Sequence, residues 1–273
     1  MASELLLEST REGVTTLTMN NPRRLNGWTV EMMTALYEAL ARLADADETE
    51  AVILTGADPY YCAGVNLSGV MRPEHPKKLR AFIIERNRGL FDTFINFPKP
   101  IIVAANGPAI GAAVTSATLC DAIVASDKAT FSTPFARLGI TPEGCSSVLF
   151  AKIMDARNAE RMLGAQGWKP TAAEAFAAGF VTELVDHDKL QDAAHARARA
   201  AIEAGGGRSY RGDMTREELL AINARESEAL ADAFLGKPFL RAQFDFLWGK
   251  KKRGPAMMFL GLLVTRPLWS RML

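Results

Sequence analysis

Short runs of apolar residues recur through the first half of the chain and predict β-strands. Two of these runs flank Arg11-Glu12-Gly13 and predict a β-hairpin. Later runs such as AVILT and IIVAA are almost uninterrupted, which is typical of strands that are buried on both faces of a parallel sheet. The predicted strands are residues 5–8, 14–19, 51–55, 101–105, 123–125 and 129–132.

Between and after these runs, apolar residues recur every three to four positions, as they do on one face of a helix. Thr29 starts the first such segment, a second spans residues 80–97 and is closed by Pro98, and from Glu143 onward the chain is mostly helical in pattern. The later predicted helices are residues 159–163, 171–178, 188–204 and 215–235. Strands interleaved with helices predict an α/β fold with a parallel, helix-covered sheet.

The change of pattern along the chain predicts three parts. We expect an α/β core over residues 1–200, a helical region over 201–253 and an apolar and basic tail over 254–273. Aromatic residues such as Phe239, Phe246 and Trp248 give the helical region more apolar surface than a lone appendage could hide. We therefore expect that region to pack on its own core or on another subunit.

Composition and charge exclude several classes of protein. The 273 residues are 48% hydrophobic and carry a net charge of +1, so neither nucleic acid nor an anionic membrane is expected as the main partner. The three cysteines are far apart, without zinc-site or disulfide spacing, and indicate a reducing, cytoplasmic setting. No apolar run is long enough for a transmembrane segment, and the first residues do not resemble a secretory signal.

One carboxylate stands out as a candidate for chemistry. Thr141-Pro142-Glu143 has the pattern of a helix start, with Thr as N-cap, Pro at the first helical position and an acid in the first turn. There the helix dipole would hold Glu143 ionised, unless an apolar pocket raised its pKa. Glu143 could simply cap a surface helix, but it has apolar neighbours and no Lys or Arg within five residues, which makes it a candidate proton carrier.

Two glycine-containing turns follow predicted buried strands. They are Cys62-Ala63-Gly64-Val65-Asn66-Leu67 and the 106–113 segment, which contains Gly111 and Ala112. Small residues at such turns leave backbone N–H groups free to point at a ligand. Taken singly, each turn could equally serve close packing.

Together these segments resemble the enoyl-CoA hydratase/isomerase (crotonase) superfamily over about residues 5–250. The resemblance rests on the order and spacing of several motifs: Asn-Pro-x-x-x-Asn at 21–26, the 62–67 turn, the 98–111 run PKPIIVAANGPAIG, Cys-Asp-Ala at 120–122, SDKATF at 126–131, and the matches within 171–181. It implies a crotonase-like α/β spiral of ββα units with a helical C-terminal trimerisation region.

The resemblance also implies a site. The N–H groups of Val65 and Ala112 would form an oxyanion hole for the thioester oxygen of an acyl-CoA. Further substrate or CoA contacts implied by position are Ala63, Gly64, Asn66, Leu67, Gly111, Arg23 and Phe135, with Arg24 a second candidate for the CoA phosphates.

The acid residues distinguish members of this superfamily. Hydratases use two glutamates, and the corresponding positions here are Thr115 and Phe135. Glu143 instead stands where Δ3,Δ2-enoyl-CoA isomerases carry their single catalytic glutamate, and the surrounding run is similar to the peroxisomal-type branch of those isomerases.

The resemblance therefore implies an isomerase of unsaturated fatty-acid oxidation that converts a 3-enoyl-CoA to the 2-enoyl-CoA. No metal or redox cofactor is expected, because coenzyme A is part of the substrate, and the expected assembly is a homotrimer or a dimer of trimers. Two alternatives stay open. One is another crotonase-fold enzyme, such as a thioester hydrolase or a dehalogenase with a carboxylate nucleophile, and the other is a non-catalytic acyl-CoA-binding subunit.

Overall fold

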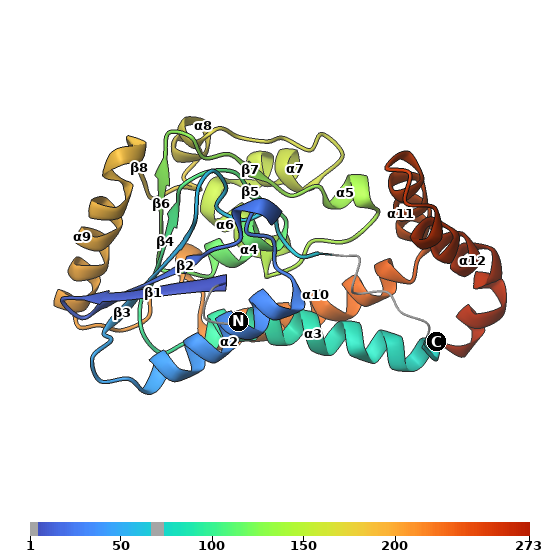
Figure 1. The fold of residues 1–273 in the computed structure, drawn as a ribbon, viewed down its shortest axis with the longest axis horizontal. Helices are drawn as coiled ribbons and strands as arrows, with labels where there is room; N and C mark the ends of the chain where they lie inside the picture. Colours follow the sequence, from blue (N-terminus) through green and yellow to red (C-terminus); the bar gives the residue numbers. More distant parts are fainter. Residues whose placement is uncertain (1–4, 67–73) are drawn as a thin grey trace.

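The computed structural model describes residues 5–66 and 74–273, and its centre is a six-stranded sheet (Figure 1). The strand order is β1-β2-β3-β4-β6-β8, in which β1 is antiparallel to β2 and all other neighbours are parallel. The strands are β1 Leu6–Arg11, β2 Val14–Met19, β3 Ala51–Gly56, β4 Ile101–Ala105, β6 Ala122–Ser126 and β8 Glu183–Val185. A small second sheet pairs β5 Ala109–Ile110 with β7 Phe131–Ser132 in parallel.

Helices cover both faces of the large sheet, as expected for buried parallel strands. One face packs against α9 Leu190–Glu203, which presents Leu190, Ala194 and Ala198 to a cluster of strand residues. The other face packs in the main core with α2 Val30–Asp45, α3 Pro76–Asn96, α4 Ala112–Thr118 and α6 Ser146–Met154. Shorter helices are α5 Phe135–Leu138, α7 Ala156–Leu163 and α8 Ala172–Ala177.

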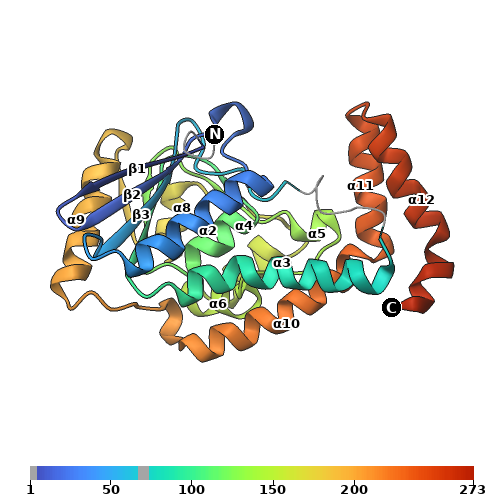
Figure 2. The same ribbon diagram turned by 60° about the horizontal axis from the view of Figure 1, so that its bottom comes forward.

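The C-terminal helices extend away from the sheet (Figure 2). Helix α10 Arg216–Phe234 packs along α3, and α11 Lys237–Gly249 and α12 Arg253–Trp269 form a helical hairpin beyond it. The residues expected as a tail therefore fold into α12, and three lysines, Lys250, Lys251 and Lys252, form the turn between α11 and α12. The α11–α12 hairpin shares an apolar cluster with residues of α3 and α10 but leaves Phe246, Val264 and Leu268 exposed, at 57, 69 and 73%.

Most of the local expectations are confirmed. The expected β-hairpin is present as β1 and β2, and so are the buried strands and the helix that follows Thr29. The Thr29 side chain accepts a hydrogen bond from the Met32 N–H. Two expectations were incomplete: β8 was missed, and residues 129–132 form only the two-residue β7, in the second sheet.

The expected helix start at Thr141 was wrong. Helix α6 begins three residues after Glu143, at Ser146, with Cys145 as its N-cap. Cys145 has a φ of 65° and follows Gly144 with a φ of 63°, so the chain turns sharply before the helix starts. The helix dipole therefore does not act on Glu143 in the expected way.

Candidate active site

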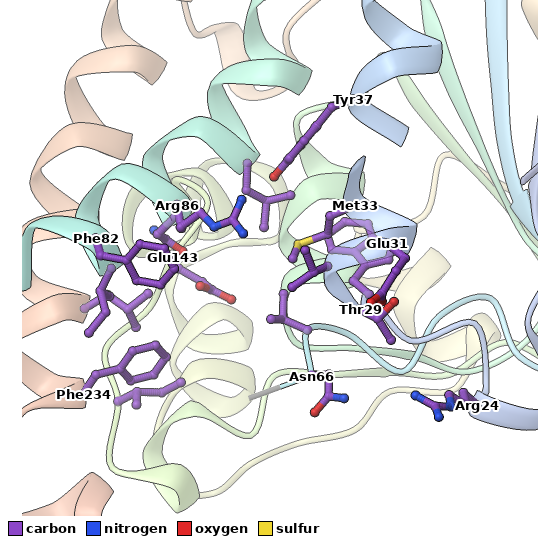
Figure 3. Close-up of a pocket in the computed structure, with 18 residues that line it drawn as sticks. Arg24, Thr29, Glu31, Met33, Tyr37, Asn66, Phe82, Arg86, Glu143 and Phe234 are labelled. Atoms are coloured by element: carbon purple, nitrogen blue, oxygen red, sulfur yellow. The ribbon is translucent and has the colours of Figure 1, made fainter. Parts of the chain in front are cut away.

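A cavity of about 300 Å³ lies among α2, α3 and α10 (Figure 3). Its walls are mainly apolar and include Trp28, Met33, Phe82, Leu90, Ile140 and Phe234. Glu143 and Glu31 are the carboxylates that line it among the described residues, and only Glu143 is buried, at 8% exposure. Figure 3 shows the Glu143 carboxyl group pointing into the cavity. An apolar cavity with a few polar groups directed into it is the usual form of a small-molecule site.

The loop that carries Glu143 is held tightly by its own backbone. The Ser146 N–H and hydroxyl both donate to the Glu143 carbonyl, at 3.2 and 2.6 Å. A methyl group added at Gly144 would lie 2.6 Å from Phe91 Cε1 and 2.8 Å from Thr115 Oγ1. Only glycine fits at this position, so the loop rests directly on α3 and α4.

Burial determines the acidity of Glu143. Its carboxylate has no hydrogen-bond or ion-pair partner within residues 5–66 and 74–273. Loss of hydration, together with a smaller contribution from the negative charge of Glu226, raises its pKa from an ordinary 4.5 to about 8. A carboxylate with a pKa near neutrality is strong enough as a base and remains able to return its proton.

Two backbone N–H groups on neighbouring turns, those of Val65 and Ala112, have no carbonyl acceptor among residues 5–66 and 74–273. The peptide groups around Val65 are engaged with Trp28, because the Trp28 N–H donates to the Gly64 carbonyl at 2.9 Å and the Asn66 N–H donates to the Trp28 carbonyl at 3.0 Å. The Gly111 N–H donates to Ser132 at 2.8 Å. Within the described part of the chain, the Val65 and Ala112 N–H groups donate to no carbonyl.

The two turns that carry these N–H groups lie side by side. The Ile110 N–H donates to the Cys62 carbonyl at 3.0 Å, and Cys62 pairs with Ala109 in a parallel bridge. At Gly64, with a φ of 79°, an added methyl group would lie 2.4 Å from the Ile110 carbonyl oxygen and 3.8 Å from the Ala112 nitrogen. Glycine there permits the close approach that puts both donors at one place.

Some of the site residues expected from the sequence line the cavity, and others lie beside it or elsewhere. Glu143, Val65 and Asn66 line the cavity, whereas Ala63, Gly64, Gly111 and Ala112 belong to the paired turns beside it. Phe135 is buried outside the lining at 2% exposure, and Leu67 lies outside the described residues. Of the two arginines, Arg24 lines the cavity. Arg23, its neighbour on the same 3-10 turn, Pro22–Arg24, is exposed and does not line it.

Sequence reasoning missed two features of the site. Arg86 and Tyr37 line one side of the cavity, and burial raises the pKa of Tyr37 to about 12, so that its hydroxyl stays protonated. Glu226, on α10, carries the charge that acts on Glu143. A signal existed for Glu226: it follows Leu219 and Ile222 and precedes Leu230 at helical spacing, which puts an acid on the apolar face of the helix. No three His, Cys, Asp or Glu side chains among the described residues are grouped closely enough to hold a metal ion.

The raised pKa of Glu143 predicts a pH-dependent cost in stability. Between pH 4.5 and about 8 the native protein keeps a proton that the unfolded chain has released, so the cost grows as the pH rises through this window. A Glu143→Gln protein should unfold at nearly the parental temperature at pH 5. At pH 9 its free energy of unfolding should be higher by on the order of 3 kcal/mol.

Thermal unfolding of both proteins at the two pH values measures this effect. Glu218→Gln is a matched control, because the Thr215 N–H and hydroxyl lower the pKa of the exposed Glu218. Its substitution should give a change of the opposite sign, a small loss of stability at high pH. An equal gain for Glu143→Gln at pH 5 and pH 9 would contradict the ionisation argument.

Comparisons with known proteins show the family to which the chain belongs. A family profile described as enoyl-CoA hydratase/isomerase matches residues 9–208. The chain is 36% identical over 259 residues to human enoyl-CoA delta isomerase 2 (Homo sapiens), covering 91% of this chain and 64% of that protein. It is 32% identical over 256 residues to the peroxisomal enoyl-CoA delta isomerase 3 of Mus musculus, covering 92% of this chain and 80% of that protein.

Among solved structures, OdaA of Pseudomonas aeruginosa superposes with a TM-score of 0.76 at 26% identity, over 90% of this chain and 99% of that one. The chain thus spans less than two thirds of the human relative and nearly all of the bacterial structure. No helix in residues 5–66 or 74–273 has the length and apolar character needed to cross a bilayer.

Proposed function

Because the chain belongs to the enoyl-CoA hydratase/isomerase family, of crotonase fold, we propose that it is an enoyl-CoA isomerase that converts 3-enoyl-CoA to 2-enoyl-CoA. The observation that carries this proposal is that, in the part of the chain that the structure describes, one buried carboxylate, Glu143, lines an apolar cavity beside two backbone N–H groups that donate to no carbonyl. The printed names of the human and mouse relatives point to the same reaction.

The proposed reaction needs one base and one site for negative charge. Glu143 removes a proton from C2 of the substrate, and the electron pair moves onto the thioester oxygen to form a dienolate. The Val65 and Ala112 N–H groups donate to that oxygen. The same carboxyl group then returns the proton at C4 while the double bond forms between C2 and C3. Substrate and product have the same atoms, so no water or second acid is consumed.

The residues at the hydratase positions argue against hydration. Adding water to a double bond requires one group to activate the water and another to deliver a proton. Thr115 is fully buried and donates to the Ala112 carbonyl at 3.3 Å, and Phe135 has no ionisable group. Neither side chain can activate water, which leaves proton transfer by Glu143 alone.

The two ends of the cavity suggest how an acyl-CoA lies in it. Arg24 and Asn66 lie toward one side in Figure 3, while Phe82 and Phe234 lie on the opposite side beyond Glu143. We therefore propose that the phosphates of coenzyme A approach Arg24 and that the acyl chain passes Glu143 into the apolar end. No cofactor besides the CoA of the substrate enters this scheme.

We propose the pathway, the location and the assembly from the substrate chemistry, the cysteines and the exposed apolar surface. Fatty-acid β-oxidation as the pathway follows from the chemistry of the substrate, and a cytoplasmic location is supported by three cysteines that are all free thiols. The exposed apolar residues of the α11–α12 hairpin support burial against further copies of the chain, in a homotrimer or a dimer of trimers.

The function is tested by offering the purified protein 3-hexenoyl-CoA and 2-hexenoyl-CoA in parallel. We expect the 3-enoyl substrate to gain the absorbance of a conjugated thioester and the 2-enoyl substrate to remain free of 3-hydroxyacyl-CoA. Efficient hydration of 2-hexenoyl-CoA would overturn the assignment. A covalent adduct on Glu143, detected by intact-mass measurement, would favour instead an enzyme with a carboxylate nucleophile.

A further inference from the structure

A second carboxylate, Glu226, lies behind the loop that carries Glu143. It stands in the middle of α10 with 6% of its surface exposed, on the helix face that points into the protein. It does not line the cavity and so cannot touch a bound substrate directly. A buried carboxylate costs free energy unless other groups compensate its charge.

The loop compensates part of this cost: burial raises the pKa of Glu226, and hydrogen bonds from the loop oppose the rise, so that Glu226 carries its negative charge in the upper part of the pH range. Its two oxygens accept hydrogen bonds from the Cys145 N–H at 2.6 Å and the Ser147 N–H at 2.9 Å. These N–H groups belong to the N-cap and the first turn of α6, where the Cys145 side chain makes no capping bond. A side chain from another helix therefore caps α6 and holds Cys145 and Ser147, just after Gly144, in place.

The helix that carries Glu226 is itself anchored. The Asn223 side chain donates to Asp92 on α3 at 2.9 Å, and the Asn87 side chain on α3 donates to Ser227 at 3.1 Å. These contacts lie one turn or less from Glu226 on α10. Helix α3 thus holds α10 in place, and α10 holds the 143–147 loop in place through Glu226.

We propose that Glu226 is a positioning residue, which fixes the loop that carries Glu143 and acts on the Glu143 carboxyl group through its negative charge. The inference rests on the proposed isomerase function. Glu226 takes no proton from the substrate and makes no contact with it, so its whole effect passes through the orientation and the basicity of Glu143.

The other ionisable groups around the cavity do not replace this effect. They are Arg24 on the 3-10 turn, Glu31 and Tyr37 on α2, and Arg86 on α3. Arg24, Glu31 and Arg86 are exposed, so solvent screens their charges, and Tyr37 stays neutral. Burial is the main cause of the raised pKa of Glu143, and Glu226 is the one charge that contributes to it appreciably.

Three variants separate charge from position. Glu226→Gln keeps the shape, loses the charge and accepts only one of the two N–H hydrogen bonds, because its amide nitrogen is a donor. Glu226→Asp keeps the charge but is too short to reach both N–H groups, so the two variants share a lost hydrogen bond and differ in charge. Glu218→Gln removes an exposed capping carboxylate of the same helix as a control. The readout is kcat/KM for 3-hexenoyl-CoA as a function of pH. Thermal unfolding establishes that each variant is folded at the assay temperature.

We expect Glu226→Gln to lower the plateau of kcat/KM at high pH about tenfold. The acidic limb of the profile, where kcat/KM falls as Glu143 takes up a proton, should move to lower pH by about one unit. Glu226→Asp should lower the plateau and leave the limb in place, and Glu218→Gln should change neither. A merely structural role would lower the plateau of Glu226→Gln without moving its limb, and this result would overturn the proposal.

A measurement without substrate keeps this inference distinct from the proposed function. Carbon-13 labelling of glutamate side chains lets the Glu143 carboxyl be titrated by NMR in the free protein, with Glu143→Gln identifying its signal. We expect a midpoint near 8 in the parent and a lower one in Glu226→Gln. A Glu143 midpoint near 4.5 in the parent, or one unchanged by Glu226→Gln, overturns the inference whether or not the protein isomerises enoyl-CoA.

Discussion

Glu143→Gln is expected to lower isomerase turnover by about a hundred- to ten-thousandfold, the usual contribution of a positioned general base. Glutamine has the same shape as glutamate but cannot accept a proton from C2 at a useful rate. No other buried carboxylate lines the cavity within the described residues, so no side chain is placed to substitute for it. The measurement is kcat for 3-hexenoyl-CoA at pH 8.5, where the parental carboxyl is ionised.

Ligand binding separates a lost base from a lost fold. Because the substitution preserves volume and removes a buried charge, the variant should bind 2-hexenoyl-CoA with an affinity close to that of the parent, as calorimetry can measure. Loss of both turnover and binding would indicate damage to the cavity. Turnover at the parental rate would show that Glu143 is not the base, and the mechanism proposed above would fail.

Ala112→Pro is expected to lower kcat/KM by about a hundred- to a thousandfold, because it removes one of the two N–H groups that face the thioester oxygen. Loss of one such donor costs about 3 kcal/mol in the transition state. Ala112 is the first residue of α4, where proline fits the helix and no intrahelical hydrogen bond is lost. Gly111 precedes it and tolerates the restriction that proline imposes on its neighbour.

A matched substitution at another helix start controls for the effect of proline itself. Arg216 is the first residue of α10, is exposed and does not line the cavity, and Thr215 before it is already extended, with a ψ of 160°. Arg216→Pro should therefore leave both folding and turnover near parental values. Equal activity of Ala112→Pro and the parent would rule out the Ala112 N–H as an oxyanion donor. A folded but inactive Ala112→Pro protein, beside an active Arg216→Pro protein, would support it.

Several parts of this protein could be predicted because the signals for them are local. The strands β2, β3 and β4 are marked by their own apolar runs, and the helix after Thr29 is marked by its cap and its spacing. The motifs around 62–67 and 98–111 identified the family, since backbone donors at tight turns need small residues at fixed spacings. Glu143 could be predicted because its signal is also local: it is an acid in an apolar stretch of the sequence.

Other parts depend on partners far away in the sequence. Strand β8 has only three residues, too few for a pattern, and becomes a strand by pairing with β6. Thr141 has the local marks of an N-cap, yet the first turn of α6 is capped by Glu226, about eighty residues later in the chain. A distant carboxylate that satisfies the Cys145 and Ser147 N–H groups moves the helix start past Glu143.

The sequence by itself determined the family, the order of the strands and helices along the chain, and the residue that serves as candidate base, because each depends on residue types at short spacings. The tertiary structure decided which turns meet, which of two neighbouring arginines lines the cavity, and how acidic Glu143 is. These properties follow from burial and from contacts between distant segments, because the pKa of a carboxyl group reflects the hydration it loses and the charges that folding brings beside it.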